Sequence, residues 1–414
     1  MQCVLVRVHR RPIGLLWLDP GRVYSPAELR DVIANTLAVD LIAHVIDDRL
    51  AEGDRDPLCA PPAPIPARCA RTIERAEWPR LTVAVCTRNR AAQIGECADA
   101  LEALDYPTDR LDILFVDNAP ADDATERALR GRPAIRYVCE PRPGLDWARN
   151  RAVLEARGEI VAFTDDDVSV DGGWAKAIAN VFLEEPAAMC VTGLVVADEL
   201  DGDAQVFFER YGGFGRGFHR VYANADGSRA AAPFHGGAGK FGTGANMAFR
   251  RVVFDRIGLF DPALDVGTVT NGGGDLEMFF RVIKAGHLLV YEPAAMVRHR
   301  HRRAYADLRV QLRNNGIGFY SYLARTAWAY PDERVAIARL GLWWLWFWNV
   351  RRLLVSFVRP SPVPRDLILA ELFGSIIGAL RYSKARARAR EILETFGPQQ
   401  AGAAVNAPMI PLVQ

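Results

Sequence analysis

Three adjacent aspartates, Asp165, Asp166 and Asp167, are the strongest local signal for chemistry in this sequence. Neighbouring carboxylates repel one another, so a bound cation is the natural compensation. Oxygen ligands favour Mg²⁺ or Mn²⁺, and such an ion is usually held by one or two carboxylates together with the phosphates of a substrate. Because an isolated acidic triplet is more often a solvated loop, its position relative to the fold has to distinguish the two interpretations.

Three other polar sets, like the triplet, directly follow short apolar runs. An aspartate just past a strand can accept hydrogen bonds from a nucleobase or a ribose, and arginine can offer forked donors to a base carbonyl or a phosphate. These sets are Thr87-Arg88-Asn89-Arg90 after residues 81–86, Asp117-Asn118 after 111–116, and Gly144 to Asn150, with Arg149, after 135–139.

Asp275 and Glu277 follow Asn271-Gly-Gly-Gly274 and begin a predicted helix. Acidic residues in a first helical turn often do no more than complement the helix dipole. The alternative is a general base that points into a cleft, where the glycines leave room for an acceptor. The sequence leaves both interpretations open.

His299 and His301 lie in the basic segment 297–303. If this segment is a strand, alternation puts both imidazoles on one face. A basic surface edge is the expectation for at least one of them, and a histidine that reaches the metal is the functional alternative.

The elements that position these residues alternate between strand and helix. Apolar runs at 81–86, 111–116, 135–139 and 160–163 are separated by helical patterns at 92–104, 124–129 and 145–156. Repeated strand–helix units predict an α/β fold whose mainly parallel sheet is covered by helices on both faces. Ligands of such sheets bind beyond the carboxyl ends of the strands, so the four polar sets should meet at one edge.

The rest of the chain divides by composition. Residues 1–50 predict a small αβ module: a hairpin of Cys3–Val8 and Ile13–Leu18 joined around Pro12, then a helix with Ser25 as N-cap. The expected divisions are a proline-rich linker at 51–80, the α/β domain at 81–305, a helical region at 306–396 and a flexible tail at 397–414. Glycine-rich loops within 211–244 are expected to cover the site.

Composition excludes several classes of protein. The formal net charge of +1 gives no indication of a nucleic-acid partner. The seven scattered cysteines contain no C-x-x-C, which is typical of a reduced compartment without a disulfide framework or thiolate zinc site. Arginines interrupt the first apolar run, so no signal peptide is predicted and the catalytic part is expected in the cytoplasm.

Taken together, the motifs resemble those of the family 2 inverting glycosyltransferases with the GT-A fold, over about residues 81–303. The resemblance rests on the order and spacing of Cys86–Arg90, Val116–Asn118, Gly144–Asn150, Phe163–Asp167, Gly242–Asn246, Gly274-Asp275 and His299. It implies a metal-assisted transfer of a sugar, with inversion, from a UDP-, GDP- or dTDP-sugar to a hydroxyl of a saccharide, lipid-linked or small-molecule acceptor.

The resemblance also implies roles for single residues. The donor-binding set is Thr87, Arg88, Asn89, Asp117, Arg149, Asp165 and Asp166. Asp165 and Asp167 correspond to the D-x-D signature and, with His299, would bind Mn²⁺ or Mg²⁺. Gly244, Asn246 and Gly274 would lie on the acceptor side. Asp275 falls where the family places its base, but Gly274 replaces the glutamate usual before it, so Asp275 and Glu277 both remain candidates for the base.

Two apolar helices are predicted near the carboxyl terminus, and both are flanked by arginines. The first, 340–350, holds four of the nine tryptophans but is too short to cross a bilayer, and the second is 367–380. Contact with the inner surface of the cell membrane is one expectation, because tryptophan and arginine favour that interface. Packing on the enzyme or in a dimer interface is the other.

Two other functions compete with glycosyl transfer. A sugar-phosphate nucleotidyltransferase should carry a glycine-rich phosphate loop after its first strand, which Thr87–Arg90 is not. A non-catalytic protein that binds a nucleotide-sugar or glycan at a membrane surface would have little use for so many acidic residues, since unused buried carboxylates are costly.

Overall fold

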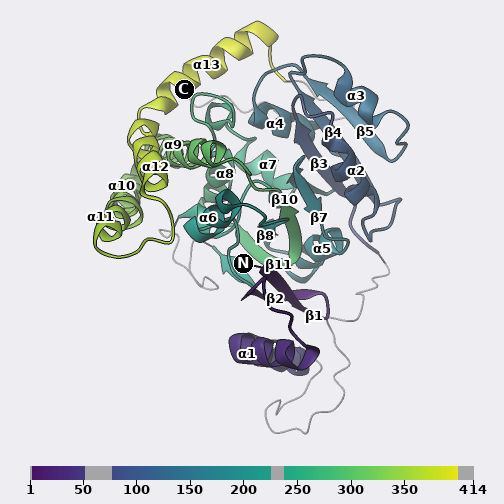
Figure 1. Ribbon diagram of the computed structural model, residues 1–414. Helices are drawn as coiled ribbons and strands as arrows, with labels where there is room; N and C mark the ends of the chain where they lie inside the picture. Colours follow the sequence, from purple (N-terminus) through teal and green to yellow (C-terminus); the bar gives the residue numbers. More distant parts are fainter. Residues whose placement is uncertain (1, 52–76, 225–236, 400–414) are drawn as a thin grey trace. The chain divides into compact units, whose positions relative to one another are not determined.

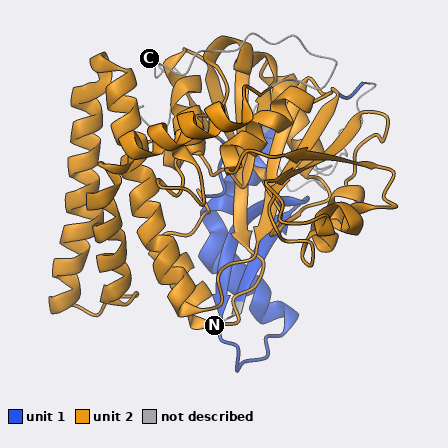
Figure 2. Cartoon of the chain, turned by 90° about the horizontal axis from the view of Figure 1, so that it is seen from above, with its two compact units in different colours: residues 1–78, 217–220 blue, residues 79–216, 221–414 orange. Residues whose placement is uncertain are grey.

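The computed structural model describes residues 2–51, 77–224 and 237–399. Contacts within the chain define two compact units, coloured separately in Figure 2. Unit 1 comprises residues 1–78 and 217–220, and unit 2 comprises residues 79–216 and 221–414.

Unit 1 contains the predicted hairpin and helix. Strands β1 (Gln2–Val8) and β2 (Arg11–Leu18) pair antiparallel, and helix α1 (Pro26–Ala51) packs on β2. The turn is at His9 and Arg10, which both have positive φ, so Pro12 lies inside β2 rather than at the turn. The predicted cap is present, because Ser25 and Glu28 bond each other's backbone N–H groups at 2.8 and 3.2 Å.

Unit 2 is built on a nine-stranded sheet with the order β5-β4-β3-β6-β10-β8-β11-β7, and β9 pairs with β11 (Figure 1). The strands are β3 (Leu81–Thr87), β4 (Leu111–Asn118), β5 (Ile135–Glu140), β6 (Ile160–Asp165), β7 (Val168–Val170), β8 (Ala188–Ala197), β9 (Val221–Ala223), β10 (Asn246–Arg250) and β11 (Leu288–His299). Strands β3 to β6 are parallel as predicted. The sheet as a whole is mixed, because β10 runs antiparallel to both β6 and β8.

The helices of unit 2 cover both faces of this sheet. Their bounds are α2 (Ile94–Glu102), α3 (Ala124–Leu129), α4 (Leu145–Glu155), α5 (Trp174–Glu184), α6 (Asp203–Tyr211), α7 (Val252–Ile257) and α8 (Gly274–Lys284). Met247 and Phe249 of β10 pack in a core cluster with α4, α7 and α8. Asn246 of the same strand points the other way and accepts a hydrogen bond from Trp174 of α5 at 2.9 Å, which places α5 on the opposite face.

Beyond the sheet the chain is helical, and Figure 1 shows these helices gathered along one flank of unit 2. They are α9 (Tyr305–Ala329), α10 (Arg334–Trp343), the π-helical segment Trp344–Val350, α11 (Arg351–Val358), α12 (Arg365–Gly378) and α13 (Arg381–Phe396). In the described part of the chain no helix is long and apolar enough to cross a membrane. The predicted linker core at 52–76 and most of the predicted tail, 400–414, lie outside the described residues.

Candidate active site

The predicted polar sets meet at one edge of the sheet. Strand register pairs Thr87 with Asp117 and Cys86 with Asp165, so the ends of β3, β4 and β6 are adjacent. Strand β11 runs parallel to β8 and ends level with it at His299. Parallel strands thus deliver the aspartates and the histidine to the same side of the molecule, where ligands of such sheets bind.

The three aspartates have different partners: Asp166 bonds within its loop, whereas Asp165 and Asp167 lie close to His299. Asp166 points inward: it accepts hydrogen bonds from Thr87 Oγ1 at 2.6 Å and from Arg90 Nη1 at 2.5 Å. Arg90 Nη1 also pairs with Asp167 Oδ2 at 3.0 Å. Because Thr87 and Asp166 are buried and satisfy each other, they hold the loop together, which does not support the expected direct contact of either with the donor. Arg90 neutralises both aspartates, a role that its place in the Thr87–Arg90 segment did not indicate.

Asp165 and Asp167, together with His299, form a group that could bind a metal ion. One ligand atom each of Asp165, Asp167 and His299 lie within 4.8 Å of one another, and His299 Nε2 is 3.5 Å from Asp167 Oδ1. Burial raises the pKa of Asp165 to about 7, and the charge of Asp167 adds to the rise. Burial also lowers the pKa of His299 to about 4, which leaves a neutral imidazole. Two carboxylates and a neutral imidazole fit Mn²⁺ or Mg²⁺ as ligands, and the excess negative charge suits a cation.

A chain of hydrogen bonds behind His299 fixes its orientation. His301 Nδ1 lies 3.1 Å from His299 Nδ1, and His301 Nε2 lies 2.6 Å from Glu209 Oε1 of α6. The ring of Phe214, from the glycine-rich loop, packs edge-on against both imidazoles. Both histidines are buried, so neither forms the basic surface edge that the sequence suggested for at least one of them. Such a chain leaves His299 Nε2 directed toward Asp167.

Asp275 begins α8 on the site side of that helix. Its Oδ2 accepts a hydrogen bond from the backbone N–H of Gly244 at 2.8 Å, and its Oδ1 accepts one from Leu276 N–H at 2.9 Å. A Cβ on Gly244 would lie 2.5 Å from Nη2 of Arg149, so a side chain there would require the guanidinium to shift. Gly244 therefore positions the Asp275 carboxylate; whether it also borders the acceptor stays a prediction.

Asp146 is a buried carboxylate that the sequence analysis did not single out. It pairs with Arg149 Nη1 at 3.0 Å, while its Oδ2 has no hydrogen-bond partner among the described residues. A Cβ on Gly274 would overlap with that oxygen, so Asp146 fills the space of a side chain at position 274. Burial raises the pKa of Asp146 to about 7, and Asp275 is among the charges that raise it. Position 274, directly before Asp275, has no side chain, and the carboxylate of Asp146 from α4 occupies that space instead.

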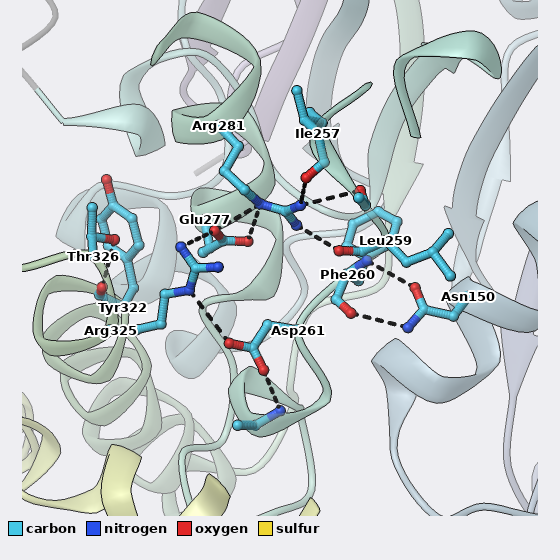
Figure 3. A network of polar contacts seen from close by, with 12 residues as sticks. Asn150, Ile257, Leu259, Phe260, Asp261, Glu277, Arg281, Tyr322, Arg325 and Thr326 are labelled. Carbon is cyan, nitrogen blue, oxygen red and sulfur yellow. Dashed lines mark hydrogen bonds and ion pairs between the residues drawn. The ribbon is translucent and has the colours of Figure 1, made fainter. Parts of the chain in front are cut away.

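Glu277 does not lie with these residues, which corrects its candidacy as the base. Its carboxylate is fully buried and forms ion pairs with Arg281 at 2.8 Å and Arg325 at 2.6 Å. Arg325 continues to Asp261, 3.4 Å away, in the network drawn in Figure 3. A general base must reach the proton that it removes. A carboxylate enclosed by two arginines is instead part of the framework that holds α8.

Asn246 is also placed differently from the expectation of an acceptor-side residue. It is completely buried, and its amide donates to the carbonyl oxygens of Leu194 and Ala295 at 3.0 and 2.8 Å. Its Oδ1 accepts the indole N–H of Trp174. These three hydrogen bonds join β10 to β8, β11 and α5, so Asn246 has a structural role.

The residues expected to bind the nucleotide differ in exposure and in hydrogen-bond partners. Asp117 is fully buried; its Oδ2 accepts a hydrogen bond from the Tyr137 hydroxyl at 3.1 Å, and the Thr125 side chain also bonds its carboxylate. Arg88 is exposed, and Asn89 uses its Oδ1 to accept the N–H of Ala121 at 2.9 Å, tying two loops together. Arg149 lies between the charges of Asp146, Asp165 and Asp275, all of which raise its pKa against the opposing effect of burial.

The sequence is similar to those of known glycosyltransferases. The chain is 24% identical over 258 residues to polypeptide N-acetylgalactosaminyltransferase 5 of Caenorhabditis elegans and 25% identical over 230 residues to the pre-mycofactocin glycosyltransferase of Mycobacterium tuberculosis. These matches cover 58% and 55% of this chain but only 40% and 44% of the two relatives.

Among solved structures, the chain resembles the mannosyltransferase PcManGT of Pyrobaculum calidifontis, which was determined with GDP-Man and Mn²⁺. The TM-score is 0.47 with 21% identity, over 78% of this chain and 89% of that one. Residues 82–258, which include the strand ends with Thr87, Asp117 and Asp165 to Asp167, match the family described as glycosyl transferase family 2. This family match spans a little under half of the chain and lies within a mixed, mainly parallel α/β sheet.

Proposed function

We propose that this protein transfers a sugar from a nucleotide-sugar donor to an acceptor hydroxyl, with inversion and with Asp275 as the general base. The observation that carries the proposal is the placement of Asp275: its charge is felt by Asp165, Asp146 and Arg149, while its carboxylate is held by two backbone N–H groups and remains half-buried. A base next to a donor site is what direct displacement at a sugar carbon requires.

The donor would lie across the strand ends. The Asp117 carboxylate suits a donor N–H or O–H of the base or ribose, and the Arg149 guanidinium would pair with the phosphates. Asp165, Asp167 and His299 would hold Mn²⁺ or Mg²⁺ there. When bound, the cation would neutralise negative charge on the diphosphate.

The reaction then forms one bond and breaks one. The acceptor oxygen bonds to the anomeric carbon as the carbon–oxygen bond to the diphosphate breaks, and the bonding pair leaves with the nucleoside diphosphate. Asp275 accepts the proton of the acceptor hydroxyl, a role worth about 10²–10⁴ in rate for a well-placed base. Arg149 stabilises the charge that develops on the leaving group.

The competing nucleotidyltransferase is less well supported, because its phosphate loop after the first strand should be glycine-rich. The loop Thr87-Arg88-Asn89-Arg90 contains no glycine, and Arg90 is paired with Asp166 and Asp167. A purely binding protein is also disfavoured, because it would not need a carboxylate held by two backbone N–H groups beside the donor residues, as Asp275 is.

A thermal-shift panel tests the proposal directly. UDP, GDP, dTDP and CDP would each be added with and without Mn²⁺ or Mg²⁺. We expect one nucleotide to stabilise the protein only when metal is present, by about 2.7 kcal/mol at 100 times its dissociation constant. Asp165→Asn should abolish the metal-dependent part, while Asp109→Asn, at an exposed carboxylate, should leave it unchanged. Stabilisation by no nucleotide, or equal stabilisation without metal, would overturn the proposal.

A further inference from the structure

The carboxyl-terminal helices expose two apolar stripes that the transfer reaction does not use. α10, the π-helical segment and α11 form one continuous helix over 334–358, since the backbone is helical at both junctions. Its first stripe consists of Leu342, Trp343, Trp346, Phe347, Phe357 and Val358, all exposed. The second stripe, on α12, consists of Leu369, Phe373, Ile376 and Leu380.

These side chains are exposed because the opposite faces of the same helices pack against the rest of unit 2. Gly374 and Gly378 of α12 bring its backbone against α9, where added Cβ atoms would collide with the carbonyls of Arg313 and Ile317. In the continuous helix, Gly341 and Ser356 are on the buried side. α12 also contacts the π-helical segment and α11, so the two stripes belong to neighbouring helices. Exposure of aromatic rings on this scale, with Trp346 at 51% and Phe357 at 63%, marks an interaction surface.

The stretch of sequence that contains the stripes is strongly basic. Residues 334–390 contain eleven arginines and lysines but only two acidic residues, Asp366 and Glu371. Glu371 is buried and accepts a hydrogen bond from Trp348 at 3.1 Å, while Asp366 bonds the Tyr305 hydroxyl at 2.6 Å. This segment therefore carries a net charge of +9 in a chain whose total is +1.

The charge and composition of this segment indicate which partner covers the stripes. A second copy in a symmetric dimer would bring the same basic segment against itself, so that like charges would repel. Tryptophan rings flanked by arginines, in contrast, suit the boundary between lipid headgroups and acyl chains, where anionic headgroups attract the cations. No described helix can cross a bilayer, so such a contact would lie along the membrane surface.

We propose that the apolar stripes on 342–358 and 369–380 dock this protein onto the surface of a bilayer that contains anionic lipids. The arginines exposed beside them, Arg339, Arg351 and Arg359, engage headgroups, while Trp343, Trp346 and Phe357 enter the interfacial region. Docking does not depend on the proposed transfer reaction, because none of these residues belongs to the active site.

Vesicle flotation with the full chain tests this proposal. Vesicles of phosphatidylcholine alone would be compared with vesicles that also contain phosphatidylglycerol. We expect binding to the anionic vesicles that falls as salt rises from about 0.1 to 0.5 M, because salt screens headgroup attraction. Brominated lipids should quench tryptophan fluorescence, and Trp343→Phe/Trp346→Phe should remove most of that quenching.

Two double variants provide the matched comparison. Trp346→Glu/Phe357→Glu should weaken binding at least tenfold, whereas Leu183→Glu/Val252→Glu, at exposed apolar residues elsewhere, should change it less than twofold. Circular dichroism and nucleotide-dependent stabilisation should be the same for both, which separates this test from that of the active site. Absence of vesicle binding by the wild type, equal binding to neutral vesicles, or a wild-type dimer that Trp346→Glu/Phe357→Glu makes monomeric without any lipid effect would each overturn the proposal.

Discussion

Asp275 and Glu277 are two residues apart in the first turn of α8, yet they belong to opposite kinds of charged region. Glu277 lies in a balanced network, where two carboxylates face two arginines: Glu277, Asp261, Arg281 and Arg325 (Figure 3). The region on the other side has more carboxylates than arginines. Asp146, Asp165, Asp166, Asp167, Asp265 and Asp275 are there, with Arg90 and Arg149 as the arginines.

The difference shows how to tell a structural cluster from a site. In the balanced network each charge is compensated within the protein, so nothing is left for a ligand. In the other region an excess of carboxylates, some with buried oxygens that lack partners, leaves a requirement that a cation and a substrate can meet. Removal of a charge should therefore reduce stability in the first region and function in the second.

The largest effect is expected at the proposed base. Asp275→Asn should lower kcat about 10²–10⁴-fold, because the amide cannot accept the proton, while Oδ1 can still accept a backbone hydrogen bond. Steady-state transfer assays would measure it. Asp307→Asn is the matched control, since Asp307 is also an acid in a first helical turn, that of α9. If both variants lose only a few tenths of a kcal/mol of stability and neither loses activity, Asp275 merely complements the helix dipole.

In the balanced network the effect should be on stability. Glu277→Gln leaves Arg281 and Arg325 buried without their shared counter-charge and should cost about 3–5 kcal/mol of unfolding free energy. Urea unfolding of the nucleotide-free protein would measure this cost. The exposed pair Arg127–Asp123 provides the contrast, because Arg127→Met should change stability by less than about 1 kcal/mol. A stable Glu277→Gln variant with lost activity would return Glu277 to candidacy as the base.

A smaller effect is expected where the protein orients the proposed metal ligand. Glu209→Gln or His301→Gln should weaken Mn²⁺ binding about 10–100-fold, because His299 loses the chain of hydrogen bonds that directs its Nε2. Electron paramagnetic resonance of free Mn²⁺, without nucleotide, would report the affinity independently of turnover. Glu126→Gln, at an exposed first-turn acid of α3, should have no effect. Unchanged affinity in both site variants would show that the chain only packs α6 against β11.

The smallest effect concerns the space between α4 and α8. Gly274→Ala should destabilise the protein by about 1–3 kcal/mol, because the methyl group would overlap with the Asp146 carboxylate. In an Asp146→Ala background the same substitution should cost much less, since the obstructing oxygens are gone. Unfolding measurements on the four members of this cycle give the coupling. Strictly additive costs would mean that Asp146 moves aside freely and does not fill that space.

Much of this molecule could be predicted from the sequence because local patterns specify it. Alternating apolar runs located β3 to β6, and the rule for ligands at strand ends brought Thr87, Asp117 and Asp165 to one edge. Helical geometry alone also separates Asp275 from Glu277, since side chains two residues apart on a helix point in different directions.

Only tertiary structure decided which of these side chains faces the site and which is consumed inside. The arginines that enclose Glu277 come from within α8 and from α9, nearly fifty residues later, and the oxygen that occupies the space beside Gly274 comes from α4. Likewise, Arg90 satisfies Asp166, and Asn246 joins three segments of the sheet. Sequence determines where a carboxylate lies along an element, but its compensation depends on partners that folding brings from distant parts of the chain.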